Sequence, residues 1–297
     1  MIQNIPNIIV KRSGYGISRI LINDSKSYNS LSTKTLKSLI KTFKYFKKDK
    51  NTKVIIIEGS GVGFSAGHNL KEIQSLRGKS QYLQLFNLCS QLMMNIVNNS
   101  KPVIAKVHGA AFAAGCQLVA TCDLALSTDK AIFATPGVNL GLFCSTPMVA
   151  VSRNVIKKKT MKLILTGEPI SAKYAKEIGL INDYFKSSQL EKKVLELARE
   201  IASKWPSAKE AWGYDNEDMA AANLWGHGLG LAQYDPPVIS RIWSLDHPVE
   251  IQAGMVFALE TQHGKPFKYG VRIEEMLIVH DDEVEIISNF PVKEIMA

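Results

Sequence analysis

The chain has 297 residues, of which 46% are hydrophobic and 21% are charged, and its formal net charge is +9. This length suits one large domain or two ordinary ones, and the composition is typical of a globular protein. No apolar run is long and charge-free enough to span a bilayer, so we expect no membrane partner. The four cysteines have no metal-like spacing, and without a secretory signal they favour a reducing compartment.

The basic residues of the N-terminal part accompany short strands and one amphipathic helix. Residues 7–24 alternate like two strands around the turn Ser13–Gly16. In residues 34–53 the apolar side chains recur at helical spacing after Ser32, a typical N-cap, and the lysines fall on the opposite face. Because no nucleic-acid motif accompanies these lysines, they predict a solvated helix face and no nucleic-acid partner. Their positive field still favours polyanionic ligands such as nucleotide phosphates.

Two apolar strands are followed by similar small-residue loops. The strand predicted at 54–58 leads to GFSAGHNLKEI (63–73), and the strand at 102–107 leads to AAFAAGCQLVATCD (110–123). A long helix separates them, and this alternation of strands and helices predicts the α/β class. Each loop opens a helix whose first N–H groups have no partner inside the helix. Two such loops side by side would direct two N–H donors at one oxygen, as an oxyanion hole does.

These segments resemble the crotonase (enoyl-CoA hydratase/isomerase) superfamily. The resemblance includes VIIIEGSGVGFSAGHNLKEI, KPVIAKVHGAAFAAGCQLVATCD and LILTGEPISAKYAKEIGLINDYF, and it extends over about residues 8–204. It implies a crotonase-like spiral of ββα turns, a coenzyme A thioester as substrate and no required cofactor. It also implies a cytoplasmic location, or the mitochondrial matrix in a eukaryote.

The resemblance further implies that the backbone N–H groups of His68 and Ala114 form the oxyanion hole for the thioester oxygen. Small residues around Ala114 would let the backbone approach that ligand closely. The imidazole of His68 is either an acid–base group, since it titrates near pH 7, or a side chain that flanks the pocket. The full set of implied acyl-CoA-binding residues is Ala66, His68, Asn69, Leu70, Lys71 and Ala114.

The usual proton-transfer carboxylates of this family are absent. Gln117 and Gly137 stand where the resemblance places the two catalytic glutamates, and Ser145 stands where isomerases have another acid. An amide can orient a ligand but cannot take a proton from water. We therefore expect weak or altered lyase or isomerase activity in fatty-acid metabolism, and the alternative is a non-catalytic acyl-CoA binder or regulator. Beside Ser145, Cys144 is either a buried structural cysteine or a nucleophile without a visible activating base.

The composition changes near Trp205-Pro206. Residues 206–297 hold six Lys and Arg against fifteen Asp and Glu, for a net charge of −9, whereas residues 1–205 carry +18. All four Trp lie at or after position 205, and all four Cys lie before position 145. Such asymmetry marks a domain boundary. We therefore predict an acyl-CoA-binding domain at 1–205 and a second domain at 206–297.

The segment at about 206–290 resembles the C-terminal part of the pita-bread metallopeptidases. The resemblance rests on NLWGHGLGLAQYDPPV, GMVFALETQHG and YGVRIEEMLIV. It implies a truncated α+β segment with metal ligands His227, Glu260 and Glu274. One imidazole and two carboxylates suit hard divalent ions.

The implied metal site is incomplete. The two-metal centre of that family also needs two aspartates from upstream strands, and Asp215 and Asp218 lie too close to His227 to replace them. A further expected histidine is Tyr234 in this chain. We therefore expect a vestigial site in a fused fragment and disfavour a metallopeptidase. This metallopeptidase-like segment stands in the place of the helices with which crotonases form trimers, so we expect a homo-oligomer to assemble poorly.

Overall fold

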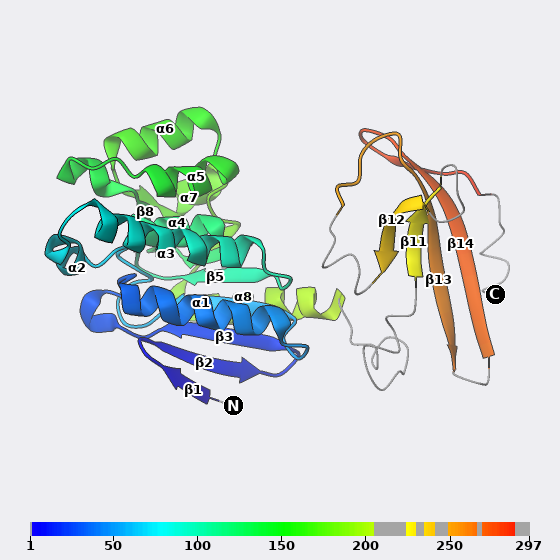
Figure 1. Cartoon of the computed structure of the whole chain (residues 1–297), viewed down its shortest axis with the longest axis horizontal. Helices are drawn as coiled ribbons and strands as arrows, with labels where there is room; N and C mark the ends of the chain where they lie inside the picture. The colour runs from blue at the N-terminus through cyan, green and yellow to red at the C-terminus, as the bar shows by residue number, and fades with distance from the viewer. Residues whose placement is uncertain (1, 205–223, 230–234, 241–248, 266–268, 289–297) are drawn as a thin grey trace. The chain divides into compact units, whose positions relative to one another are not determined.

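Figure 1 shows the computed structural model of the chain. The structure describes residues 2–204, 224–229, 235–240, 249–265 and 269–288. The chain forms two compact units, Met1–Trp205 and Pro206–Ala297, each with a large sheet of its own. Among the described residues, no helix combines the length and the apolar character that a membrane span requires.

A seven-stranded sheet forms the base of the first unit. In sheet order the strands are β1 (Ile2–Ile5), β2 (Ile8–Ser13), β3 (Ile17–Ile22), β4 (Val54–Gly59), β5 (Val103–Val107), β7 (Leu124–Thr128) and β10 (Asp183–Phe185). The first three strands pair antiparallel, and the pairs from β3 to β10 are parallel. The two strands predicted around Ser13–Gly16 are β2 and β3, which confirms that prediction.

Helices cover both faces of this sheet, which explains why its parallel strands are apolar almost throughout. Ile55 and Ile57 of β4 belong to the core that α1 (Thr33–Lys48) and α3 (Lys79–Val97) also enter. Val54 and Ile56 instead pack in the cluster of α8 (Ser187–Lys204) on the opposite face. The two cores follow from the period of two along a strand.

A group of four charges holds α8 against the sheet. Glu191 of α8 pairs with Arg19 of β3 at 2.5 Å and with Lys106 of β5. Glu58 of β4 pairs with the same two cations, at 2.7 Å and 2.8 Å. Each cation therefore has two carboxylate partners, and the four charges link three neighbouring strands to one helix.

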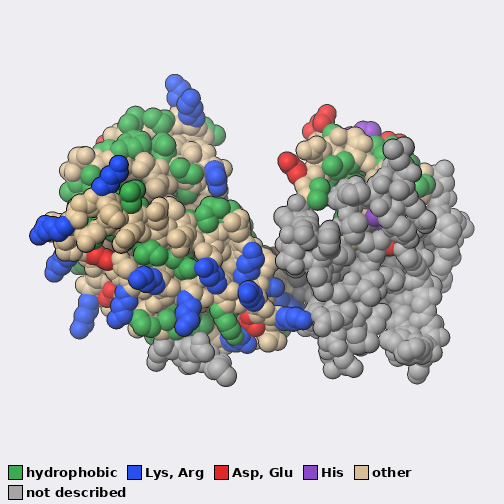
Figure 2. All heavy atoms as spheres, viewed as in Figure 1, with side chains coloured by type: hydrophobic (Ala, Val, Ile, Leu, Met, Phe, Trp, Pro, Cys, Tyr) green, Lys and Arg blue, Asp and Glu red, His purple; other side chains and the backbone are tan. Residues whose placement is uncertain are grey.

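Helix α1 confirms the predicted amphipathic pattern. The Ser32 hydroxyl accepts a hydrogen bond from the Thr35 N–H at the start of the helix. The lysines of α1 are all exposed, and Figure 2 shows Lys and Arg side chains over this face of the unit. The helix ends at Lys48, two residues after the last apolar position of the pattern, Phe46. Asp49 then begins a turn in which its carboxylate accepts a hydrogen bond from Thr52 at 2.6 Å.

A second layer repeats one unit of structure along the chain. β5 continues into β6 (Ala110–Phe112) and α4 (Ala114–Thr121), and β7 continues into β8 (Ile132–Ala134) and the 3-10 helix η2 (Pro136–Leu140). β6, β8 and β9 (Ile170–Ser171) form a small second sheet. This order of two strands and a helix is the predicted ββα spiral. The other elements of this unit are η1 (Ser25–Ser27), α2 (Leu70–Ser75), α5 (Ser145–Asn154), α6 (Lys157–Thr166) and α7 (Ala172–Glu177).

The second unit contains a five-stranded antiparallel sheet. In sheet order its strands are β12 (Asp235–Ser240), β11 (Leu224–Gly228), β13 (Val256–Lys265), β14 (Tyr269–Val279) and β15 (Val284–Ile286). The longest pairing joins β13 to β14, from Val256 opposite Ile278 to Lys265 opposite Tyr269. The sequence resemblance predicts an α+β segment here, and the described residues of this segment form an extra C-terminal sheet.

Candidate functional site

The first small-residue loop, between β4 and α2, is fixed by residues that follow β3. The buried Asn29 amide donates hydrogen bonds to the carbonyls of Ser60 (2.7 Å) and Gly63 (2.8 Å). Farther along the loop, the Leu31 N–H donates to the Gly67 carbonyl at 2.7 Å. These bonds hold both ends of the loop to one short segment of the chain.

The second loop, between β6 and α4, contains a strained residue. Ala113 has φ 49° and ψ −117°, a conformation that residues with a Cβ rarely adopt. Backbone outliers of this kind cost on the order of 1–3 kcal/mol and cluster at functional sites. Ala113 donates its own N–H to the Ala134 carbonyl at 2.9 Å and is the N-cap of α4. Ala114 follows as the first residue of the helix, where an N–H has no intrahelical acceptor.

The two loops are in direct contact. Ser65 and Ala111 form an isolated parallel bridge, and the Phe112 N–H donates to the Ser65 carbonyl at 2.9 Å. A Cβ added to Gly67 would lie 3.0 Å from the Ala114 nitrogen, and one added to Gly115 would lie 2.3 Å from the Ser65 carbonyl oxygen. Glycine at both positions is therefore what allows the backbones to approach so closely.

The two predicted oxyanion donors lie on these touching loops. Within the described part of the chain, neither the His68 N–H nor the Ala114 N–H donates to a backbone acceptor. Two free N–H groups on adjacent rigid loops are suited to bind an oxygen that carries negative charge. The structure thus brings together the two residues that the sequence selects, and their role remains a prediction.

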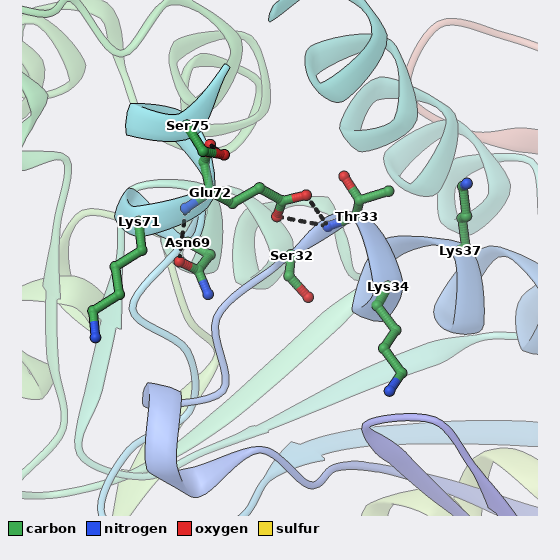
Figure 3. A pocket seen from close by; sticks show the side chains of 8 residues that line it. All are labelled: Ser32, Thr33, Lys34, Lys37, Asn69, Lys71, Glu72 and Ser75. Atoms are coloured by element: carbon green, nitrogen blue, oxygen red, sulfur yellow. Dashed lines mark hydrogen bonds between the residues drawn. The ribbon is translucent and has the colours of Figure 1, made fainter. Parts of the chain in front are cut away.

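Of the residues predicted to bind the CoA part of the ligand, some line a pocket and others lie exposed on the surface. Asn69 caps α2 by accepting a hydrogen bond from the Glu72 N–H at 3.1 Å. Ala66 and Leu70 are exposed. Asn69 and Lys71 line a pocket of about 720 Å³ (Figure 3), and the full lining is Ser32, Thr33, Lys34, Lys37, Asn69, Lys71, Glu72 and Ser75.

Charge in this pocket is mostly positive. Lys34, Lys37 and Lys71 line it, and among the described residues none of the three has an ion-pair partner. The Glu72 carboxylate accepts hydrogen bonds from the Thr33 N–H at 3.0 and 3.3 Å, drawn as dashed lines in Figure 3. The pocket is therefore lined by three lysines beside the start of α1, where the Thr33 N–H is already hydrogen-bonded to Glu72.

The two positions at which the sequence predicts missing catalytic glutamates differ in the space that they offer. Gln117, on α4, is 5% exposed, and its Oε1 lies 3.9 Å from the Cys89 thiol. Gly137, in η2, is crowded, because a Cβ there would lie 2.6 Å from the Cys144 sulfur and 2.8 Å from the Leu142 carbonyl oxygen. The space for a side chain at 137 is therefore filled by the thiol of a residue seven positions along the chain, a contact that the sequence does not reveal.

Cys144 and Ser145 show no activated nucleophile. Cys144 is half-buried, and burial raises the pKa of its thiol while a hydrogen bond from the Gly137 backbone opposes that shift. A thiol is a weak nucleophile until it ionises. Ser145 is the first residue of α5, and its side chain does not titrate.

In the second unit the register relates the three predicted metal ligands. His227 of β11 pairs with Ala258 of β13, and Glu260 pairs with position 274 of β14. The His227 Nε2 lies 3.6 Å from the Glu260 Oε1, and the two residues are 2% and 3% exposed. Among the side chains that the structure describes, no group of three or more metal donors converges. Three predicted positions lie outside the described residues, namely Asp215, Asp218 and Tyr234, and only the backbone of Glu274 is described, so the three-ligand site remains a prediction.

The spiral fold and the paired loops define a crotonase-type protein, and comparison with known families agrees. The model of the enoyl-CoA hydratase/isomerase family matches residues 12–214, so the chain belongs to that family. A second model, of metallopeptidase family M24, matches residues 186–281. Both resemblances identified in the sequence are thereby confirmed.

Among similar relatives is enoyl-CoA hydratase domain-containing protein 3, a mitochondrial protein. The rat protein is 44% identical over 198 residues, which cover 67% of this chain and 66% of that one. The human protein is 46% identical over 188 residues, covering 63% and 62%. The chain thus spans slightly less than two thirds of these relatives. Its segment FATPGVNLGLFCSTP, at 133–147, resembles that protein in particular.

Solved structures give the same result. The human enoyl-CoA hydratase domain-containing protein 3 is 44% identical, with a TM-score of 0.64 over 66% of this chain and 78% of that one. An enoyl-CoA hydratase from Mycobacterium smegmatis is 39% identical, with a TM-score of 0.66 over 67% and 77%. The mixed α/β crotonase fold is therefore shown for this chain, followed by an additional C-terminal sheet.

Proposed function

We propose that residues 1–205 bind an acyl-CoA thioester whose carbonyl oxygen accepts hydrogen bonds from the His68 and Ala114 N–H groups. The observation that carries this proposal is the pair of free N–H groups on two touching loops, one of them held by the strained Ala113. The lysines of the pocket at Asn69 and Lys71 supply positive charge for the phosphates of CoA.

The chemistry of such a site is stabilisation of a thioester enolate. Removal of an α-proton, or addition of a nucleophile to Cβ of an enoyl thioester, moves negative charge onto the carbonyl oxygen. One fixed donor in a hole of this kind contributes about 2.7–4 kcal/mol to the transition state. This is a reaction of the lyase or isomerase type in CoA-thioester metabolism, with no cofactor beyond the substrate.

Proton transfer limits that reaction in this chain. Gln117, Gly137 and Ser145 cannot act as general acids or bases, and a well-placed acid or base contributes about 10²–10⁴-fold. Turnover is therefore weak or altered relative to hydratases with both glutamates. The alternative is a binder or regulator without catalysis, which the crowded Gly137 favours.

The second unit, residues 206–297, is proposed as a fragment without peptidase activity. Imidazole and carboxylate donors at His227, Glu260 and Glu274 fit one divalent ion and are too few for a pair of ions. Because this unit stands where crotonases have trimer-forming helices, the proposed protein assembles poorly into homo-oligomers. Neither nucleic acid nor membrane is a proposed partner, and the location is the cytoplasm or the mitochondrial matrix.

Isothermal titration calorimetry tests the proposed site directly. The ligands are butyryl-CoA, S-butyl-CoA (a thioether that lacks the carbonyl oxygen) and free CoA. Two hydrogen bonds of about 1 kcal/mol each make the thioester bind about 10–30-fold more tightly than the thioether. Equal affinities for these two ligands contradict the oxyanion hole. Turnover of crotonyl-CoA in the same samples separates the enzyme from the non-catalytic binder.

A further inference from the structure

The His68 imidazole presents a free hydrogen-bond acceptor. Its Nδ1 lies 3.3 Å from the Leu31 carbonyl oxygen, which can only accept, so Nδ1 carries the hydrogen. Burial lowers the pKa of His68, against smaller opposing effects of this hydrogen bond and of Glu72, so the ring is neutral near pH 7. In that tautomer Nε2 is an acceptor. Within the described part of the chain, this buried Nε2 has no hydrogen-bond partner.

The ring of His68 faces the same helix as Gln117. It meets Phe86 of α3 edge to face, with ring centroids 5.5 Å apart and an interplanar angle of 82°. Cys89, one turn farther along α3, lies 3.9 Å from the Gln117 Oε1. The imidazole and the amide at a missing-carboxylate position therefore point at one face of α3, and Phe86, 38% exposed, is the outer of the two contacts.

Backbone and side chain of His68 would act on one ligand. The backbone N–H is the proposed donor to the thioester oxygen, so the imidazole of the same residue lies within one side-chain length of that oxygen. In the proposed site, the first carbons of the acyl chain would occupy this neighbourhood. A buried acceptor without a partner calls for a donor there, and the apolar Phe86 ring beside the imidazole favours an uncharged one.

We infer that His68 makes the site selective for thioesters whose acyl chain carries a hydroxyl near the carbonyl, and that Nε2 accepts the hydrogen bond from this hydroxyl. His68 is thus a specificity-determining residue in a pocket that lacks the usual carboxylates. The inference rests on the proposed acyl-CoA site. Entry of the ligand requires the Phe86 ring to turn aside, which its partial exposure permits.

The test compares dissociation constants for butyryl-CoA, 2-hydroxybutyryl-CoA and 3-hydroxybutyryl-CoA by calorimetry. The wild-type chain is expected to prefer one hydroxylated ligand by about 5–10-fold, as one net hydrogen bond provides. His68→Phe keeps a ring of similar shape without the acceptor, and the preference should fall to about 1-fold. His68→Gln, with an amide oxygen in reach, should retain part of it. His108→Phe is the matched control, since His108 is half-buried between β5 and β6 and its Nε2 already has a hydrogen-bond partner, the Gly61 carbonyl at 2.9 Å.

Because the measured quantity is a ratio within each variant, a general loss of stability does not imitate the result. A wild-type preference below 2-fold for both hydroxylated ligands overturns the inference, as does a preference that survives in His68→Phe. In the first case Nε2 is satisfied by water instead. Failure of the proposed function looks different, because butyryl-CoA would then bind no better than S-butyl-CoA in every variant.

Discussion

Replacement of Gly67 by alanine is expected to push the two loops of the site apart. Gly67 has φ 87°, and an added Cβ would lie 2.8 Å from the Phe112 carbonyl oxygen and 3.0 Å from both the Ala113 Cβ and the Ala114 nitrogen. Two of these neighbours are backbone atoms, so the contact cannot be relieved by a side-chain rotation. The variant therefore displaces one of the proposed N–H donors relative to the other.

Gly78 provides a matched control for the backbone cost. Its φ is 88°, and nothing lies within 4 Å of an added Cβ. Gly78→Ala should lose about 1–2 kcal/mol of unfolding free energy, because L-residues disfavour positive φ. Gly67→Ala carries the same cost and adds about 1–3 kcal/mol of overpacking. The expected loss for Gly67→Ala is therefore about 2–5 kcal/mol.

Urea unfolding can report on the two units separately. Every helix in the described residues lies before position 205, whereas all four tryptophans lie at or after it. Helical circular dichroism thus follows the first unit, whereas fluorescence follows the second unit through three of the four tryptophans, with Trp205 at the end of the first unit. Equal losses of stability for the two alanine variants in the helical signal would contradict the predicted clash at Gly67. So would a Gly67→Ala variant that binds butyryl-CoA as tightly as Gly78→Ala.

Two further predictions concern titratable groups. Cys144 should react first with a thiol reagent in the native protein, because it is half-buried while the other three thiols are buried; simultaneous labelling of all four would contradict this. Glu191 has its pKa lowered to about 2 by hydrogen bonds from Arg19 and Lys106. A depressed carboxylate pKa stabilises the fold fully above the ordinary value of 4.5 and loses that effect as the pH falls toward 2. The stability difference between wild type and Glu191→Gln should therefore shrink over this window, and a constant difference would refute it.

The strand–loop–helix order of the first unit could be predicted from local pattern. Apolar strands, small-residue loops and helix starts follow one another within short stretches, and the structure reproduces them at β4 and at β5 to α4. The extent of elements was less predictable. The end of α1 at Lys48 depends on the turn at Asp49, and β1 depends on pairing with β2.

Contacts between distant residues lie beyond that local pattern. The Asn29 amide reaches the carbonyls of Ser60 and Gly63, more than thirty positions away. The positive φ of Ala113 arises because the loop is held between Ala134 and α4, whereas alanine by itself does not indicate such a backbone. In the second unit the sequence resemblance implied an α+β segment, but the buried approach of His227 to Glu260 depends on how β11 pairs with β13.

Glutamate introduced at both positions 117 and 137 should fail to produce fast hydration unless Cys144 is also changed. Glutamate at position 137 must place its Cβ 2.6 Å from the Cys144 sulfur and 2.8 Å from the Leu142 carbonyl oxygen, so the side chain or the loop has to move. We expect Gln117→Glu with Gly137→Glu to hydrate crotonyl-CoA no faster than Gln117→Glu alone. Addition of Cys144→Ala removes the closest contact, and the triple variant should be about 10²-fold faster, the lower end of the contribution of a general acid or base.

The assay follows the loss of the enoyl thioester absorbance, with Gln117→Glu/Cys144→Ala as the control for removal of the thiol alone. A double glutamate variant that already gains about 10²-fold would show that the loop from Pro136 to Cys144 yields easily. The contact seen at Gly137 would then be no obstacle. A triple variant that equals its control would show instead that position 137 does not face the substrate. The first result would keep residue 137 in the site and remove only the obstacle, and the second would remove residue 137 from the site. A gain confined to the triple variant would place residue 137 and the thiol of Cys144 at the same point of the proposed acyl site.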